Sequence, residues 1–472
     1  MTTDFTKGSP LKQIFLFSIP FLIGNLFQQF YNIADMVIVG RALDPAAYGA
    51  VGSTGSLVWF ASGAIQALTT GFSVVTARCF GAQDDEGVKR SFAVSIKLSA
   101  IISVLMALVC TLFARPILEF MRTPDDIMER AYGYIVWVFA GLVATALFNL
   151  LSNMIRALGD SRTPLYFLVI ACIINIALDF FLIVVCGMDT DGAGLATVLA
   201  QLISGLLCIG YIVKKQPRLH ISAKYFKFDL ALDRLLLQVG LPMAFLNMVL
   251  SVGSIVMQFV TNGMGTLYVT SQTTGAKLES FVTQPLLSFG SSVAVFAAQN
   301  YGAKQYGRVI AGGRKTILMG MVWCIIASLI MVPFGRFFVT LLAGDVEQTI
   351  IENGYRYILI NTLLSFVLVP LIVYKSILQS VGRTSWCMVS GFTEIIGRAG
   401  LSLVVIALMN GALTAVSLDE QSAFTLMCFC SPLAWLFGFL TVWGDYIFMV
   451  RKFKKLEKTK PENEQTTQKG LA

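Results

Sequence analysis

Long apolar runs are the feature of this sequence that most constrains its fold. About 20 consecutive apolar residues are needed to cross the hydrocarbon core of a bilayer as a helix. The chain holds enough such runs for twelve spans. We predict membrane-spanning helices at residues 14–39, 51–77, 92–114, 131–154, 164–186, 192–213, 237–262, 268–298, 316–334, 355–380, 387–409 and 424–448.

The composition excludes the soluble classes of protein. Of the 472 residues, 56% are apolar and only 13% are charged, whereas soluble domains carry about 25% charged residues. Disordered chains are poor in apolar residues, so disorder is excluded as well. The nine cysteines are scattered through apolar runs without the spacing of disulfides or metal ligands. We therefore expect a polytopic membrane protein with no nucleic-acid partner.

The distribution of basic residues predicts the orientation. The net charge is +8, and Lys and Arg are concentrated between spans 6 and 7 and in the C-terminal tail. Cytoplasmic loops of membrane proteins carry such an excess. We expect a multi-pass protein of the plasma (inner) membrane with both termini in the cytoplasm, in contact with membrane lipids.

Three sequence matches indicate an internal repeat with an offset of 221 to 223 residues. Six spans per repeat place both halves in the same orientation. We predict an N-terminal lobe at 1–213, a cytoplasmic linker at 214–236, a C-terminal lobe at 237–450 and a basic tail at 451–472, in a monomer. The matched pairs are Ser18–Phe21 with Gly240–Met243, Phe80–Gln83 with Tyr301–Lys304, and Arg156–Asp160 with Gln379–Arg383.

Two parallel repeats of six spans are a common plan of secondary transporters. In these proteins the substrate path lies between the halves, which rock to give alternating access. The fold class predicted here is therefore an all-α membrane protein with two six-helix repeats, and the predicted function is transport.

Acidic residues inside the spans are candidate functional residues, because burying a charge in a membrane is costly. Asp35 in span 1 and Asp179 in span 5 have no cation nearby in sequence. Each shares its helix face with polar residues at helical spacing. These residues, together with a similar stripe on span 6, are Gln28 and Asn32 beside Asp35, Asn175 beside Asp179, and Thr197 with Gln201.

If these stripes converge, they form an oxygen-rich pocket that holds two carboxylates. Two nearby carboxylates in a low dielectric cannot both ionise cheaply, so one could exchange a proton near neutral pH. The same oxygens could instead bind Na⁺. Either event changes the charge of the pocket and can bias a two-state equilibrium. Pro20, on the same helix as Asp35, is a candidate hinge.

Charges of both signs occur in two later spans. Glu394 and Arg398 are spaced i, i+4 and could neutralise each other on one helix face. Lys277 and Glu279 do not share a face and need other partners. The roles of these four residues are left open by the sequence.

Two segments give a resemblance to a known family. Asn25–Arg41 resembles the first helix of the multidrug and toxic compound extrusion (MATE) family, and Arg156–Pro164 resembles the segment before its fifth helix. The resemblance implies a V-shaped pair of lobes around a central cavity and a polyspecific exporter of drugs and toxic compounds, driven by inward H⁺ or Na⁺. The 35 Phe and 18 Met residues would suit lipophilic cationic substrates. Span 7, Gly240–Asn262, lacks the glutamate of one Na⁺-driven branch, so the match is nearer the branch that couples through the first lobe.

The resemblance also implies roles for single residues. It assigns cation coupling to Asp35, Asn175, Asp179 and Thr197. A kink would lie at Pro20, and Gln28 would contact substrate. From the polar stripes, we add Asn32 and Gln201 to the predicted substrate cavity.

Rival functions have weaker support. A lipid-linked oligosaccharide flippase of the same wider superfamily is the alternative, although such flippases usually need a more cationic cavity. The chain contains no HExxH, GxSxG or GxxxxGK[ST] motif, so neither an enzyme nor an ATP-driven pump is expected. No cofactor is expected.

Overall fold

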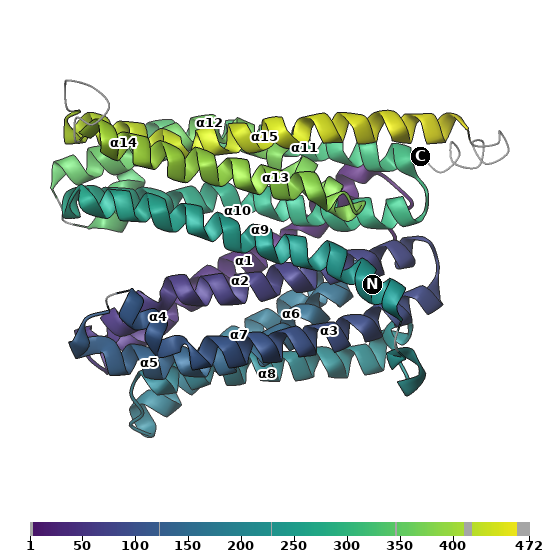
Figure 1. Ribbon diagram of the computed structural model, residues 1–472, viewed down its shortest axis with the longest axis horizontal. Coiled ribbons are helices and arrows are strands. Elements are labelled where there is room, and N and C mark those ends of the chain that lie inside the picture. Colours follow the sequence, from purple (N-terminus) through teal and green to yellow (C-terminus); the bar gives the residue numbers. More distant parts are fainter. Residues whose placement is uncertain (1–2, 122, 228, 345–346, 410–417, 460–472) are drawn as a thin grey trace. The chain divides into compact units, whose positions relative to one another are not determined.

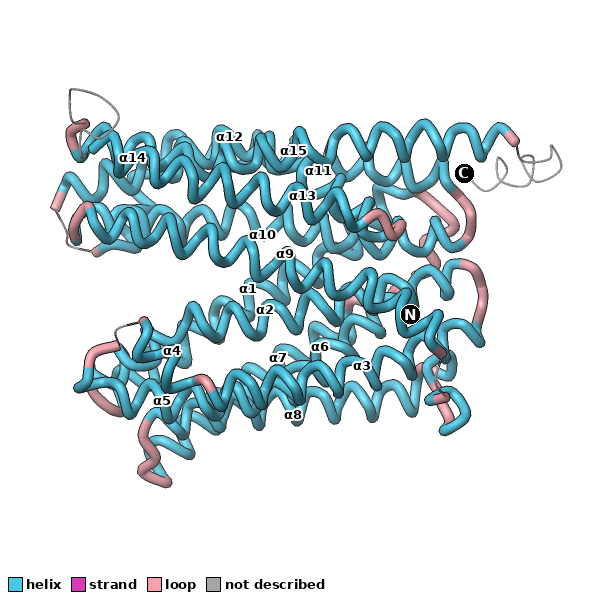
Figure 2. The backbone as a smooth tube through the Cα atoms, viewed as in Figure 1, coloured by secondary structure: helices cyan, strands magenta, loops and turns pink. Residues whose placement is uncertain are grey.

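The computed structural model describes residues 3–121, 123–227, 229–344, 347–409 and 418–459. In this part of the chain every regular element is a helix and no strand occurs (Figure 2). The predicted all-α membrane fold is confirmed.

Figure 1 shows the helices coloured in the order in which they follow one another along the chain. The first half contains α1 (Pro10–Ala42), α2 (Pro45–Gly81), α3 (Asp85–Leu112), α4 (Ala114–Phe120), α5 (Asp125–Ala140), α6 (Leu142–Ala157), α7 (Arg162–Asp179), the π-helix η1 (Phe180–Val185) and α8 (Thr190–Lys215). Two short 3₁₀ helices, η2 (Pro217–Leu219) and η3 (Ala223–Phe226), follow. The second half contains α9 (Leu230–Gly263), α10 (Thr266–Gly302), α11 (Tyr306–Ala343), α12 (Gln348–Ser380), α13 (Thr384–Ile395), the π-helix η4 (Ile396–Gly400), α14 (Leu401–Met409) and α15 (Glu420–Lys458).

The described helices supply the predicted number of spans. Eleven helices, with η1 and η4 counted in the spans they interrupt, are long and apolar enough to cross a membrane. The α5–α6 pair passes the same test and bends by 44°, which gives twelve spans when the pair counts as one. The bend lies at Gly141, where a Cβ atom would stand 2.1 Å from Cγ2 of Val198 in α8. The close approach of α8 therefore requires a glycine there.

Contacts divide the chain into two compact units. Unit 1 comprises Met1–Thr6, Ile19–Asn247 and Ala298–Lys304, and unit 2 comprises Lys7–Ser18, Met248–Ala297 and Gln305–Ala472. The chain therefore passes between units inside α1, α9 and α10. The segment 214–236, predicted as a linker, belongs wholly to unit 1, and α15 continues to Lys458 in the segment predicted as a tail.

The backbone confirms the internal repeat. Gln83 and Lys304 are the non-glycine residues with positive φ in the described chain, at 58° and 56°. They occupy equivalent positions of the Phe80–Gln83 and Tyr301–Lys304 matches. Gly159 and Gly382, in the third matched pair of segments, have φ of 87° and 82°.

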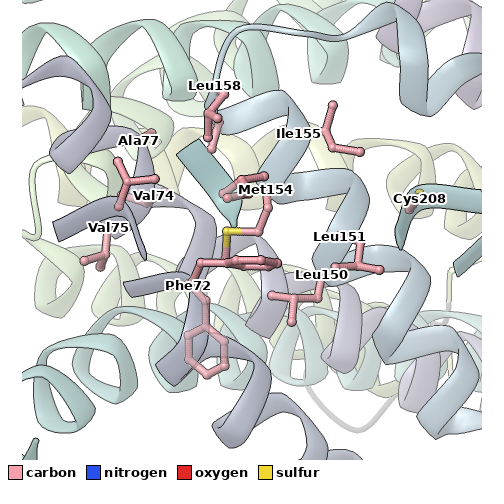
Figure 3. Packing of buried hydrophobic residues seen from close by; sticks show 14 of the residues in the cluster. Phe72, Val74, Val75, Ala77, Leu150, Leu151, Met154, Ile155, Leu158 and Cys208 are labelled. Atoms are coloured by element: carbon pink, nitrogen blue, oxygen red, sulfur yellow. The ribbon is translucent and has the colours of Figure 1, made fainter. Parts of the chain in front are cut away.

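The core of unit 1 packs α2 against α6 (Figure 3). Phe72 of α2 and Met154 of α6 are fully buried in it. A Cβ atom on Gly240 of α9 would lie 2.5 Å from the Phe72 ring, and one on Gly71 would lie 2.6 Å from the Gly240 Cα. Small residues let membrane helices approach this closely, so the first part of α9 is fixed on α2.

The ends of α2 and α10 interlock within unit 1. A Cβ atom on Gly81 would lie 1.9 Å from the carbonyl oxygen of Gln299, and one on Gly302 would lie 1.9 Å from that of Arg78. The two glycines belong to equivalent segments of the repeat. The crossing is therefore reciprocal, and it depends on the absence of both side chains.

An N-terminal strap, residues Thr3–Thr6, ties this crossing to the turn after α6. The Phe5 side chain is fully buried, its N–H donates to Gln299 Oε1 (3.1 Å), and its carbonyl accepts from Asn300 Nδ2 (3.1 Å). Gln299 Nε2 also donates to the carbonyl of Ala157 (2.8 Å). The Thr3 N–H donates to the carbonyl of Gly159 (3.0 Å).

Candidate functional site

Two acidic side chains meet in the interior of unit 1. Asp35 lies on α1 and is 5% exposed, and Asp179, the last residue of α7, is fully buried. Their carboxyl groups lie within hydrogen-bonding reach of each other. Because a carboxylate can only accept, a hydrogen bond between the two requires a proton on one of them. The structure thus brings together two predicted site residues that lie far apart in sequence.

Asn175 and Thr197 complete the polar cluster around Asp179. In the orientation that satisfies both partners, the Asn175 amide nitrogen donates to Asp179 Oδ2 (3.0 Å). Its oxygen accepts from the backbone N–H of Thr197 on α8 (3.2 Å). Asn175 is fully buried, and α7 packs against α8. These contacts place the polar stripes of α7 and α8 on facing sides, as predicted.

Two tyrosines at this cluster were not anticipated from the sequence. Tyr31 donates a hydrogen bond from its hydroxyl to Thr197 Oγ1 (3.1 Å). Tyr134 of α5 is buried, and its hydroxyl group interacts electrostatically with the carboxyl groups of Asp35 and Asp179. The i, i+4 spacing of Tyr31 and Asp35 is a signal that could have revealed the first. Nothing in the sequence relates Tyr134 to α1 or α7.

The local backbone changes where the site is built. The α-helical geometry of α7 ends at Asp179, and the π-helix η1 begins at Phe180. π-Helical turns occur often at functional sites, because they turn side chains out of the regular register. Asp35 Oδ1 and Asp179 Oδ1 are buried without a hydrogen-bond partner among the described residues. Two oxygens of the site can therefore accept a further donor or cation.

The other predicted site residues have mixed outcomes. Gln28 lies on α1 and Gln201 on α8, both half-buried. Gln201 Oε1 is buried without a partner in the described structure. The side chain of Asn32 lies outside the described residues. Pro20 is buried inside α1, which runs unbroken through it, and the division between the units falls between Ser18 and Ile19.

The ion pair that the spacing of Glu394 and Arg398 allows does not form in the described structure. Glu394 forms a buried ion pair with Lys375 of α12 and accepts from Ser390 Oγ (3.1 Å). Arg398 instead donates from Nη1 to Ser254 Oγ (3.0 Å). The π-helix η4 begins at Ile396 and contains Arg398. It shifts the register after Glu394, so the i, i+4 rule of a regular α-helix no longer applies.

The site of unit 1 is not repeated chemically in unit 2. Tyr357 stands at the repeat position of Tyr134, and Arg398 stands at that of Asn175. The Tyr357 hydroxyl donates to Glu279 Oε2 (2.9 Å). The guanidinium group of Arg398 in unit 2 therefore occupies the repeat position of the Asn175 amide, which donates to Asp179 in unit 1. Of the acid site in unit 1 and the group of Glu279, Tyr357 and Arg398 in unit 2, only the acid site combines two carboxyl groups.

A second polar cluster joins the starts of two helices to α5. Arg130 donates from Nη1 to Asp44 Oδ1 (2.7 Å) and from Nε to Asp189 Oδ2 (2.8 Å). Asp44 also caps α2 by accepting from the Ala47 N–H (2.8 Å), and Asp189 caps α8. We name this cluster the Arg130 clasp. The sequence did not reveal it, because its residues lie in three separate segments.

Comparisons with known proteins agree with this architecture. A family model described as MatE matches residues 20–181 and 242–418. The probable multidrug resistance protein YoeA of Bacillus subtilis is 27% identical over 333 residues, 68% of this chain and 70% of YoeA. The probable multidrug resistance protein NorM of Thermotoga maritima is 22% identical over 388 residues, 81% of this chain and 83% of NorM.

Solved structures show the same fold. One described as "Crystal structure of MATE in the bent conformation" superimposes with a TM-score of 0.84 at 21% identity, over 97% of this chain and 99% of that one. An outward-facing multidrug resistance MATE family transporter of the MOP superfamily gives a TM-score of 0.83 at 20% identity, over 97% and 100%.

Proposed function

This chain belongs to the MatE family, and from that premise we propose that it is a cation-coupled antiporter that exports lipophilic organic cations across the plasma membrane by alternating access. Its relatives bear the names of multidrug resistance and multidrug export proteins. The transported class and the coupling are proposals for this chain. A lipid-linked oligosaccharide flippase, the alternative function, is not favoured by these relatives.

The observation that carries the proposal is the contact between the carboxyl groups of Asp35 and Asp179. With one proton the pair carries a single negative charge, and without it two like charges face each other in a buried site. That repulsion is large in a low dielectric. Loss of the proton therefore changes the relative free energies of conformations that hold the two helices together or apart.

The surroundings of the pair favour H⁺ over Na⁺ as the coupling ion. A sodium ion needs several oxygen ligands, whereas the Asn175 oxygen already accepts from the Thr197 N–H and its nitrogen faces Asp179. A nitrogen donor at that position stabilises a carboxylate and repels a metal ion. Asp35 Oδ1 and Asp179 Oδ1 are then the oxygens of the pair without partners in the described structure. Two oxygens are fewer ligands than a sodium ion needs, whereas a proton needs only one.

A negatively charged site also suits the proposed substrates. Gln28 lies on the same helix as Asp35, and the unpartnered Oε1 of Gln201 lies on α8. An organic cation that binds near the deprotonated pair would compete electrostatically with the proton. If the organic cation and the proton cannot bind at the same time, export of the cation is coupled to uptake of the proton.

The test uses the purified full chain in proteoliposomes loaded with a cationic dye such as ethidium. An imposed proton gradient should drive dye transport, and a sodium gradient of equal size should not. Asp35→Asn and Asp179→Asn should each lower the proton-driven rate by about tenfold or more, since coupling energies are typically 1–3 kcal/mol. Asp126→Asn, which removes an exposed carboxyl group on α5, is the matched control.

The outcomes separate the rival functions. Full proton-driven transport by both aspartate variants would refute the coupling role of the pair. Transport driven by sodium alone would refute the choice of ion. Flipping of a lipid-linked oligosaccharide without any dye transport would favour the alternative function.

A further inference from the structure

We infer that a basic cleft beside the connection between α8 and α9 binds the phosphate of an anionic phospholipid. The cleft has a volume of about 520 Å³. It is lined by residues of α3 and by residues on either side of position 228, all within unit 1: Glu86, Arg90, Val94, Lys224, Tyr225, Lys227, Asp229, Leu230 and Leu232. This inference does not depend on which substrate is exported.

The connection and the first turn of α9 are docked on α3 by three polar contacts. Tyr225 donates from its hydroxyl to Glu86 Oε2 (2.9 Å). Arg218 pairs with Asp85 (3.1 Å), and Lys97 pairs with Asp233 (2.8 Å). These contacts hold the two walls of the cleft together in the folded protein.

These contacts leave more positive than negative charge in the cleft. Its lining contains the cations Arg90, Lys224 and Lys227 and the acids Glu86 and Asp229. Glu86 already accepts from Tyr225, and Asp229 accepts from the Leu232 N–H at the start of α9 (3.1 Å).

The three basic side chains remain accessible to a ligand. Lys224 and Lys227 are exposed, and Lys224 Nζ lies 4.6 Å from the centre of the Tyr225 ring. Arg90 approaches Glu86 only at 3.9 Å, with both side chains more than half exposed. An anion placed between the three cations would meet net positive charge, because three cations face two acids in the lining.

The position of the cleft identifies the ligand as a lipid. It lies where two candidate spans begin, at Asp85 of α3 and Leu230 of α9, which is the depth of the headgroups in a bilayer. Phe226 and Leu230 beside it are 43% and 68% exposed. Apolar side chains next to basic ones are typical of surfaces that contact anionic membranes. The phosphate would occupy the cleft, and the acyl chains would contact these apolar side chains.

The experiment measures lipid binding to the full chain in a neutral detergent by native mass spectrometry. Phosphatidylglycerol should bind more tightly than phosphatidylcholine of the same chain length. The triple variant Arg90→Gln, Lys224→Gln, Lys227→Gln should weaken phosphatidylglycerol binding by about 100-fold, because each basic residue near a membrane surface contributes about 1 kcal/mol. The double variant Lys224→Arg, Lys227→Arg should keep the affinity.

The matched control removes the same number of charges from the exposed end of α15, with Lys452→Gln, Lys454→Gln, Lys455→Gln. It should bind phosphatidylglycerol like the unmodified chain. Equal losses in both triple variants would show a general charge effect and overturn the proposal. Equal binding of the two lipids would also overturn it. Displacement of the lipid by glycerol 3-phosphate at equal concentration would assign the cleft to a soluble phosphate instead.

Discussion

Two pairs of buried ionisable residues in this protein have different environments. Asp35 and Asp179 face another acid and retain oxygens without partners in the described structure. Lys375 and Glu394 in unit 2 instead neutralise each other, and Ser390 satisfies the glutamate further. The first arrangement changes its charge when one proton leaves. The second is neutral as a pair, and we expect it to be structural.

The structural role of the Lys375–Glu394 pair can be tested by its energetics. Lys375→Met alone leaves a buried carboxylate without its partner and should destabilise the protein by about 3–5 kcal/mol, whereas replacing both residues should cost much less. Thermal unfolding in detergent of Lys375→Met and of the double variant Lys375→Met, Glu394→Leu measures the difference. Equal destabilisation by both variants would contradict this expectation.

Helical spacing predicted which residues share a face on each of the three helices of the acid site, and it left open whether the helices converge. The polar stripes on the first, fifth and sixth spans follow from the 3.6-residue period, and the structure places Asp35, Asn175, Asp179 and Thr197 together. The partner of Glu394 could not be predicted in the same way. A π-helical turn changes the register locally, and the sequence gives no local sign of where such a turn starts.

Individual helices are positioned by close backbone contacts and by capped ends. The crossing of α2 and α10 relies on Gly81 and Gly302, and the Arg130 clasp joins the starts of α2 and α8 to α5. Neither feature involves the acid site directly. Both determine where the helices that carry or adjoin it are held.

Gly81→Ala should destabilise the protein by about 1–3 kcal/mol or more, the usual cost of overpacking a tight contact. Its new Cβ atom would lie 1.9 Å from a carbonyl oxygen, so the backbone of α10 must move. Gly55→Ala is the control, because it lies on the same helix and its Cβ atom would meet nothing within 4 Å. Thermal unfolding of the two variants compares them directly. A control as damaging as Gly81→Ala would show that the crossing is not the cause.

The Arg130 clasp predicts a dependence of stability on pH. Hydrogen bonds from Arg130 and from the Ala47 N–H hold the pKa of Asp44 below its ordinary value. A carboxyl group with a lowered pKa in the folded state stabilises the protein above its unfolded pKa, and this contribution is lost as the pH falls through the folded pKa.

The protein should therefore lose stability below about pH 4 through this group. Arg130→Gln should be less stable than the unmodified chain at neutral pH, and the difference should shrink in acid. Melting temperatures of both proteins across this pH range provide the measurement. A difference that stays constant or grows in acid would contradict the assignment.

At the scale of the whole molecule, the protein is a multi-pass membrane transporter built from a duplicated set of helices. The number of spans and the repeat could be predicted, because apolar length and recurring segments are properties of the sequence itself. The limits of the compact units could not. They depend on contacts such as those of Gln299 with Ala157, which join residues from opposite halves of the chain.

The proposed orientation, with both termini in the cytoplasm, predicts the accessibility of cysteines. Cys186 is the exposed cysteine of the chain, and it follows η1 on the side proposed to face outward. A membrane-impermeant maleimide added to intact cells should label Cys186. It should not label a cysteine introduced by Lys455→Cys into a Cys186→Ser background. Labelling of the second protein and not the first would reverse the orientation.

The N-terminal strap has a practical consequence for anyone who attaches a reporter to this protein. Phe5 is fully enclosed and bonded on both sides, so a bulky fusion placed directly before Thr3 would compete for the same space. A fluorescent or affinity tag joined after α15 avoids that interference and would be the safer choice for purification.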